Sequence, residues 1–315
     1  MTSTAALRAG PLTFVTLSLF LLTGVAPQAQ AAGPTAEEVA KIDSAVPARA
    51  HATPAQPRRL LVFTLCHGYV HASIPYGAKA IELMGQKTGA FTATISDDIA
   101  QFEPETLNGY DAICLVSALG ELFLPPDLAS LSPEQQAQAR AKDARLKAGL
   151  LAYLRRGKGL AAIHGASYAF YDWPEFGVAL GGFFDSHPWT ATQKIAVKLE
   201  DPAHPLLAAF QGVGFEIIDE GYQFKAPYSR AHNRVLYSLD PARMAPPKAR
   251  LRPDHDFGLC WVRRYGQGRI FYSALGHNPE EYWNPMLLEH FLDGIQFALG
   301  DLAADTAPLP LPAAR

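Results

Sequence analysis

The feature that most constrains the fold is an alternation of short apolar runs with segments of helical pattern along the first half of the chain. The runs are rich in branched apolar residues, which is typical of strands buried on both faces of a parallel sheet. We expect strands at 59–66, 91–95, 111–117 and 159–164, with helices at 73–89 and 132–156. This order predicts an α/β fold, with a flavodoxin-like, doubly wound and mostly parallel sheet covered by helices on both faces.

The second half of the chain has a more open pattern. Strands are expected at 194–199 and 215–224, and the runs 257–264 and 269–274, separated by Y-G-Q-G, predict a β-hairpin. A last helix at 284–300 carries an apolar stripe and ends at Gly300. These strands predict an antiparallel extension of the parallel sheet.

The N-terminus has the pattern of a signal peptide. An apolar run of 15 positions, 12–26, is followed by small residues at Ala29 and Ala31. A transmembrane helix requires roughly 20 apolar residues, so an uncleaved membrane anchor is the weaker alternative. We therefore expect residues 1–31 to be removed from an exported protein, periplasmic or secreted, that has no membrane contact after cleavage.

The rest of the chain divides into three expected parts. Residues 32–57, rich in Ala and Pro, predict a flexible linker with a short helix near 37–42. Residues 58–302 form the expected domain, and 303–315 a flexible tail.

Composition excludes several classes of protein. The chain has 315 residues, 27 basic against 30 acidic, so a nucleic-acid partner is not expected. Three cysteines are too few for a disulfide scaffold. We expect no nucleotide cofactor, and the sequence does not predict an oligomeric state.

Histidines gather where the expected strands end. His67 and His71 follow the first strand, His164 ends the fourth, and His277 follows the hairpin. In open α/β sheets, ligands bind beyond the carboxyl ends of the strands, so these side chains are candidates for one site. His187, in the turn D-S-H-P, is a further candidate.

Adjacent carboxylates at Asp219 and Glu220 form a second polar group. Neighbours in a strand point to opposite faces, so only one of them can enter a given pocket. An imidazole with a carboxylate suits either general acid/base chemistry or a divalent metal. Their spacing along the chain matches no local metal motif, so both alternatives stay open.

Aromatic residues are frequent in the same turn-rich segments. Most belong to the core by base rate. Some would suit stacking on the apolar faces of sugar rings, and Trp173, Trp189 and Tyr222 are the candidates.

Several segments in this order resemble the ThuA-like (trehalose-utilisation) family. They are G-Y-V-H-A-S-I-P at 68–75, A-I-H-G-A-S at 162–167, Y-D-W-P at 171–174, G-G-F-F-D-S-H-P at 181–188, D-E-G-Y at 219–222, 257–261 and A-L-G-H at 274–277. The resemblance covers roughly Arg58 to Leu302. It implies the fold of the class I glutamine amidotransferase-like superfamily, a three-layer α/β/α sandwich.

The resemblance also implies a site and a substrate class. The family's polar positions correspond to His71, His164, His187, Glu220 and His277, and its association is with disaccharides and their 3-keto derivatives. The amidotransferases carry a nucleophilic cysteine at the elbow after a strand. Here His164 occupies the elbow, so glutaminase activity is not expected.

The preferred hypothesis is an exported carbohydrate-processing protein that acts on a sugar or 3-keto-glycoside as a hydrolase, lyase or isomerase. His164, Glu220 and His277 are the expected catalytic residues, and His71, His187, Tyr222, Trp173 and Trp189 the expected substrate-binding ones. His71, His164 and His277 are the expected ligands of one divalent metal, zinc first. The alternative is a non-catalytic sugar-binding module. A hydrolase with Ser117 or Ser167 as nucleophile is disfavoured, because the elbow is not G-x-S-x-G.

Overall fold

The computed structural model describes Met1 and residues 31–310. The expected signal peptide, apart from Met1 and Ala31, lies outside the described residues. Within them, no helix is both long enough and apolar enough to cross a bilayer.

Nine of the described strands form one mixed sheet, in the order β2-β1-β3-β4-β11-β10-β9-β6-β7. The neighbours from β2 to β11 pair in parallel, and those from β11 to β7 pair antiparallel. The predicted parallel sheet with an antiparallel extension is therefore confirmed. The strands of the sheet are β1 (Arg59–Phe63), β2 (Thr92–Ser96), β3 (Ala112–Val116), β4 (Gly159–Ile163), β6 (Lys194–Leu199), β7 (Phe215–Ile218), β9 (Arg234–Leu239), β10 (Gly258–Tyr265) and β11 (Gly268–Ser273).

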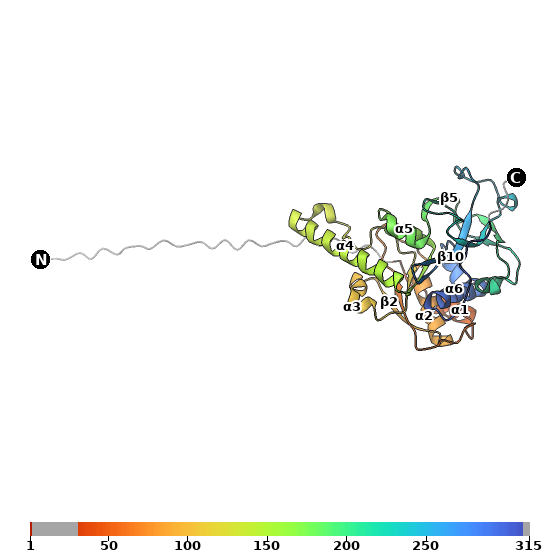
Figure 1. Cartoon of the computed structure of the whole chain (residues 1–315), viewed down its shortest axis with the longest axis horizontal. Helices are drawn as coiled ribbons and strands as arrows, with labels where there is room; N and C mark the ends of the chain where they lie inside the picture. The colour runs from red at the N-terminus through yellow and green to blue at the C-terminus, as the bar shows by residue number, and fades with distance from the viewer. Residues whose placement is uncertain (2–30, 311–315) are drawn as a thin grey trace. The chain divides into compact units, whose positions relative to one another are not determined.

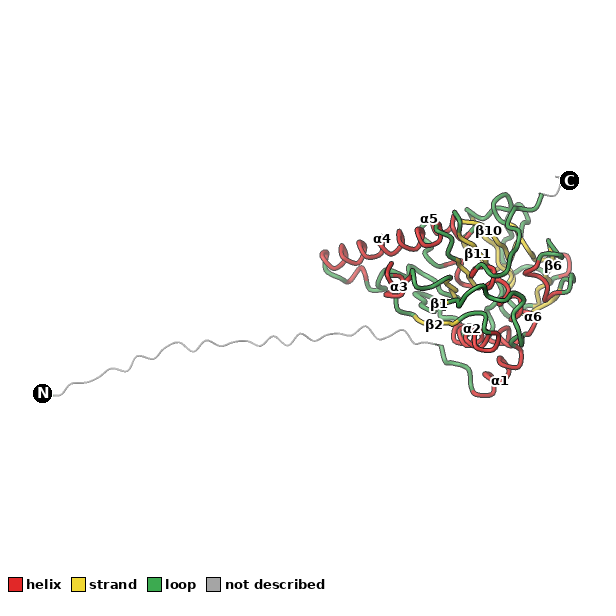
Figure 2. Tube along the Cα trace, turned by 60° about the horizontal axis from the view of Figure 1, so that its bottom comes forward, coloured by secondary structure: helices red, strands yellow, loops and turns green. Residues whose placement is uncertain are grey.

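Helices cover both faces of the sheet, as expected for an α/β sandwich (Figure 1). One group lies together below the sheet in that view: α1 (Ala36–Ala45), α2 (Ile74–Thr88) and α6 (Pro285–Leu299). The longest helix, α4 (Pro133–Arg155), and α5 (Pro174–Leu180) lie above it, and a single turn, α3 (Pro104–Leu107), lies near α4. Figure 2 shows the same separation from a second direction.

The helix ends follow the expected local rules. Ser132 accepts a hydrogen bond from the backbone of Gln135, whose side chain bonds back to the backbone of Ser132, so α4 begins with a capping box. Gly89 and Gly300 end α2 and α6 in the left-handed conformation that glycine adopts without strain. Ser73, a residue type that often caps helices, directly precedes α2, but its hydroxyl makes no capping bond and instead donates to the carbonyl of Gly276 at 2.8 Å.

Two segments differ from the expected elements. The segment expected as a linker contains α1, whose Ile42 is fully buried in the main core. The single strand expected at 215–224 is instead two, β7 in the main sheet and β8 (Gly221–Lys225), which pairs with β5 (Phe183–Trp189) in a separate two-stranded sheet. The chain leaves one sheet for the other at Asp219 and Glu220, where both carboxylates turn inward and are buried.

Candidate functional site

Three histidines meet at the carboxyl ends of parallel strands. His71 lies in the loop after β1, His164 directly follows β4, and His277 follows β11. Strands β4 and β11 are neighbours in the sheet, and β1 is separated from β4 only by β3. The three residues are far apart in sequence, and the parallel pairing brings them to one edge.

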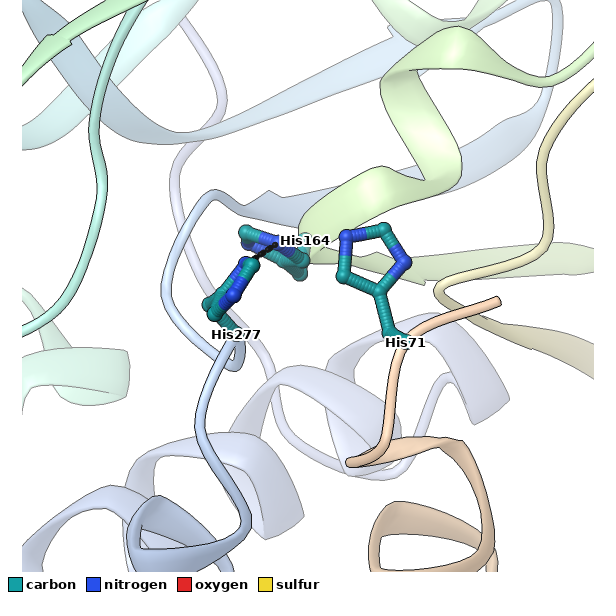
Figure 3. A group of neighbouring side chains, drawn as sticks. All are labelled: His71, His164 and His277. Carbon is teal, nitrogen blue, oxygen red and sulfur yellow. Dashed lines mark hydrogen bonds between the residues drawn. The ribbon is translucent and has the colours of Figure 1, made fainter. Parts of the chain in front are cut away.

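The three rings form a compact cluster (Figure 3). Ring centroids lie 4.8 Å apart for His71 and His164, and 5.1 Å apart for the two pairs that include His277. One nitrogen from each ring lies within 4.8 Å of the other two. Three nitrogens that bind one ion at about 2.0–2.1 Å each lie at most about 4.2 Å apart, so the rings would have to move slightly inward to share an ion.

His164 is held by the backbone on both sides. Its φ of 53° lies in the left-handed region, which few non-glycine residues adopt. Its Nδ1 lies 2.7 Å from the carbonyl oxygen of Ala274 and donates to it. The other nitrogen, Nε2, therefore carries a lone pair, which lies 3.0 Å from the hydroxyl of Tyr222 and 3.2 Å from Nδ1 of His277. Burial, with repulsion from His71 and His277, lowers the pKa of His164 well below its ordinary value.

His71 is also neutral at physiological pH. Burial, followed by repulsion from His277, lowers the pKa of His71 to about 4. Figure 3 shows its ring directed at the other two histidines. Its Nδ1 is buried and has no hydrogen-bond partner among the described residues, and a side chain at Gly165 would contact the ring at 3.0 Å. The ring of His71 is therefore closely packed, but its buried Nδ1 has no hydrogen-bond partner among the described residues.

Glu220 supplies the negative charge of the cluster. Its Oε2 lies 3.2 Å from Nδ1 of His277 and 3.7 Å from Nε2 of His164, and its Oε1 lies 3.6 Å from Nδ1 of His187. Burial opposes ionisation of Glu220, but the hydrogen bond from His277 lowers its pKa below the ordinary value. Burial likewise opposes protonation of His277, yet the bond to Glu220 raises the pKa of His277. Glu220 is therefore ionised at neutral pH, and His277 keeps its proton to a higher pH than an ordinary histidine does.

Asp219 lies beneath this pair and orders both of its members. Its Oδ1 accepts the backbone N–H of Glu220 at 2.6 Å, and its Oδ2 accepts that of Gly276, next to His277, at 3.0 Å. Burial raises the pKa of Asp219 to about 6. Burial and the charge of Asp219 raise the pKa of Glu281 well above its ordinary value, so Glu281 keeps its proton and donates it to Asp219.

The expected substrate-binding residues divide into two groups. Tyr222 contacts His164 directly, with ring centroids 4.8 Å apart, and exposed His187 faces Glu220. Trp189 is fully buried and donates to the carbonyl of Ala245. Trp173 packs against Phe170 and Phe176. The structure does not bring these two tryptophans into the cluster.

His67, the other expected candidate, plays another part, and the cysteines take no part in the cluster. His67 bonds to the carbonyl of Glu121 at 3.1 Å. The cysteines are free and buried, and Cys114 and Cys260 lie inside strands. The sequence-based interpretation missed Tyr69, whose ring lies 4.8 Å from that of His71, and the ordering role of Asp219. The position of Tyr69 two residues before His71 was the one available signal.

The cluster combines the ligand types that zinc prefers. Two imidazoles are neutral and one, His277, becomes so on losing a proton to the solvent, while Glu220 offers an oxygen. Three protein nitrogens with a further position for water or substrate is the usual arrangement of a catalytic zinc site. The carbonyl of Ala274 fixes the tautomer of His164, as second partners of metal-binding histidines usually do.

Comparison with known proteins supports the same family as the sequence motifs. The trehalose-utilisation family ThuA matches residues 59–298. A protein described as ThuA-like from Bacteroides uniformis has a similar fold, with 21% identity, a TM-score of 0.56, and coverage of 78% of this chain and 94% of that one. A second, from Parabacteroides merdae, has 18% identity, a TM-score of 0.51, and coverage of 78% and 92%. No curated protein matches the chain.

Proposed function

The chain belongs to the ThuA family of trehalose-utilisation proteins, and from this we propose that its histidine cluster binds one divalent metal ion, zinc first, and acts on a sugar or 3-keto-glycoside. The observation that carries the proposal is the convergence of His71, His164 and His277 within 4.8 Å, with an ionised Glu220 beside them. Neither a structural core nor a simple hydrogen-bond network needs three mutually adjacent imidazoles, two of them with a lowered pKa.

The expected ligands fit a metal ion better than they fit one another. Nε2 of His164 is an acceptor that faces the cluster, and the ring of His71 is directed at it with no partner for its buried Nδ1. A buried polar group without a partner costs about 1–3 kcal/mol. We infer that the protein tolerates this cost because His71 is a metal ligand.

A divalent ion at this site would polarise the carbonyl of a keto-sugar and so make the neighbouring C–H more acidic. Glu220 is placed to accept that proton, because it is ionised at neutral pH and its carboxylate lies between His277 and His187. Burial raises the pKa of Tyr222 well above its ordinary value, so its hydroxyl remains a hydrogen-bond donor. His187, exposed at the outer side of Glu220, can orient sugar hydroxyls. Removal of a proton beside a carbonyl begins both eliminations and isomerisations.

The proposal includes export to the periplasm or the medium, with cleavage of the signal peptide after Ala31. Its support is the apolar run at 12–26 followed by small residues at Ala29 and Ala31. The N-terminal sequence of the protein recovered from the periplasmic and medium fractions tests it. A chain that keeps Met1 and remains in the cytoplasm contradicts it.

Metal analysis and product analysis together test the function. We expect about one metal ion per chain in the wild type, lost in His71→Ala, His164→Ala and His277→Ala. His232→Ala removes an exposed loop histidine and is the matched control that keeps the metal. Turnover of a panel of 3-keto-glycosides should disappear in the same three variants and in Glu220→Gln. A wild type without stoichiometric metal overturns the metal site, and sugar binding without turnover favours the non-catalytic module.

A further inference from the structure

Exposed aromatic rings are rare in this protein and occur only beside the cluster. Of all Phe, Tyr and Trp side chains in residues 31–310, only Tyr69 and Tyr168 are exposed, at 66% and 38%. Exposing a large ring forgoes the gain of about 25 cal/mol per Å² that burial would bring. Single exposed apolar residues need no explanation, but here both lie within ring contact of residues in or next to one polar site.

Tyr69 borders the cluster on the side of His71. Its ring meets that of His71 edge-on at 4.8 Å and lies nearly parallel to that of His277, at 6.3 Å and 20°. The backbone beneath it is fixed, because the thiol of Cys66 donates to the carbonyl of Tyr69 at 3.2 Å. A side chain at the preceding Gly68 would collide with Leu119 at 2.6 Å. The exposure of Tyr69 is thus built into an ordered loop.

Tyr168 is connected to the cluster through Phe184 and Tyr222. Its ring lies 4.1 Å from that of Tyr171 in a stacked arrangement, and meets Phe184 edge-on at 5.9 Å. Tyr171 is fixed from two directions, since Nζ of Lys225 lies 3.7 Å from its ring and its hydroxyl donates to the carbonyl of Phe184 at 2.8 Å. Phe184 in turn contacts Tyr222 at 4.6 Å. Tyr168 therefore rests on a rigid support that leads directly into the site.

We propose that Tyr69 and Tyr168 are the stacking surfaces of two sugar subsites, one on each side of the histidine cluster, so that the substrate is a glycoside of at least two rings. This inference rests on the proposed function, which supplies the sugar. A pyranose has apolar C–H faces that pack on an aromatic face, while its hydroxyls face the surrounding polar groups. A ring on Tyr69 comes next to His71 and His277, and a ring on Tyr168 comes next to Phe184 and His187.

Sugar binding by aromatic variants tests the two subsites. The probes are trehalose, with two rings, and methyl α-glucoside, with one, titrated calorimetrically into the metal-loaded protein. We expect Tyr69→Ala and Tyr168→Ala each to weaken trehalose binding about fivefold to tenfold and to leave the metal content unchanged. Tyr69→Phe should bind like the wild type, because stacking uses the ring and not the hydroxyl.

The matched control is Tyr265→Ala, the same change at the far end of β10, where the ring lies against Arg155. It should leave sugar affinity unchanged, and methyl α-glucoside should lose affinity in at most one of the two site variants. Wild-type affinity for trehalose in both Tyr69→Ala and Tyr168→Ala overturns the subsites while the proposed function stands. Loss of the metal in Tyr69→Ala also overturns its role in stacking, since the residue would then act through His71. A wild type that binds no sugar overturns the proposed function and this inference together.

Discussion

Nδ1 of His164, at the end of β4, donates to the carbonyl oxygen of Ala274, just beyond β11, over 2.7 Å. This bond joins two neighbouring parallel strands at the point where both enter the site. It also decides which nitrogen of His164 is free, because a ring that donates from Nδ1 presents the lone pair of Nε2 to the cluster.

Replacing His164 by Asn should separate the structural from the binding role of the ring. The amide nitrogen of Asn can take the place of Nδ1 and keep the bond to Ala274, whereas Nε2 is lost. We expect His164→Asn to lose the metal but to have a free energy of unfolding within about 1 kcal/mol of that of the metal-free wild type. His164→Ala should cost roughly 2–3 kcal/mol, because it leaves the carbonyl of Ala274 unpaired and opens a cavity. Metal content and denaturant unfolding check this. Equal stability of the two variants contradicts the role of the bond.

Metal binding near neutral pH should release a proton, and His277 should be its source. His71 and His164 have lowered pKa values and are already neutral, whereas the pKa of His277 is raised by Glu220. Titration calorimetry in buffers of different ionisation enthalpy measures the number of protons released per metal ion bound. At a pH below the raised pKa of His277, we expect about one proton per ion. Glu220→Gln removes the cause of the raised pKa and should reduce the release. Release of two or more protons contradicts this assignment.

Stability should fall as the pH drops from about 6.5 to about 4. Burial lowers the pKa of His290 to about 4, from an ordinary value of 6.5. Because its folded pKa is the lower one, His290 contributes stability that is complete above the unfolded pKa and is lost as the pH falls through the folded one. The difference corresponds to about 3 kcal/mol. His290 lies outside the cluster, packed between Phe210 and Phe271, so the test does not depend on the metal.

Denaturant unfolding between pH 7 and pH 4 measures this slope. In the variant His290→Asn, the amide nitrogen can replace Nδ1 as the donor to the carbonyl of Leu206, but the side chain does not titrate. It should start from a lower stability and lose less of it on acidification. A slope equal to that of the wild type contradicts the prediction.

Substitutions of the two buried carboxyl groups beneath the site should reduce stability by unequal amounts. Glu281 keeps its proton at neutral pH, so Glu281→Gln preserves a donor and should cost less than about 1 kcal/mol. Asp219→Ala leaves the backbone N–H groups of Glu220 and Gly276 without their acceptor and should cost roughly 2–4 kcal/mol. It should also weaken metal binding. Unfolding and metal titration check both, and equal costs for the two variants contradict the protonation of Glu281.

A methyl group at Gly165 should disturb His71 without breaking the fold. A Cβ there would lie 3.0 Å from Cε1 of His71 and 3.4 Å from Leu119, so the ring must shift by a few tenths of an ångström. We expect Gly165→Ala to weaken metal binding about tenfold and to cost at most about 2 kcal/mol of stability. Gly149→Ala is the control, since the site lies within α4 with 3.8 Å to its nearest neighbour. It should stabilise slightly and leave metal affinity unchanged.

The sequence could predict the fold class and the meeting of His71, His164 and His277, because both depend on strand periodicity. Parallel strands place their carboxyl ends at one edge wherever they stand in the sheet. The break at Asp219 and Glu220 could not be predicted in this way. The run Phe215 to Phe224 is continuously strand-like, whereas the break is accompanied by tertiary hydrogen bonds, including the one from the backbone of Gly276 to Asp219.

Exposure was the other property beyond reach. Trp189 and Tyr69 both stand in turn-rich segments with similar local composition, yet the first is fully buried and the second is 66% exposed. Burial depends on what packs above a residue, which for Trp189 includes Phe257, far away in the sequence. Local composition cannot distinguish the two cases.

The place of β11 in the sheet has a consequence for how the protein comes into being. This strand is the last to be synthesised, yet it inserts between β4 and β10 in the middle of the sheet. His277 follows β11, so His71 and His164 alone form an incomplete group until this strand has inserted. The proposed metal site would therefore gain its third histidine only after the C-terminal third of the chain has folded.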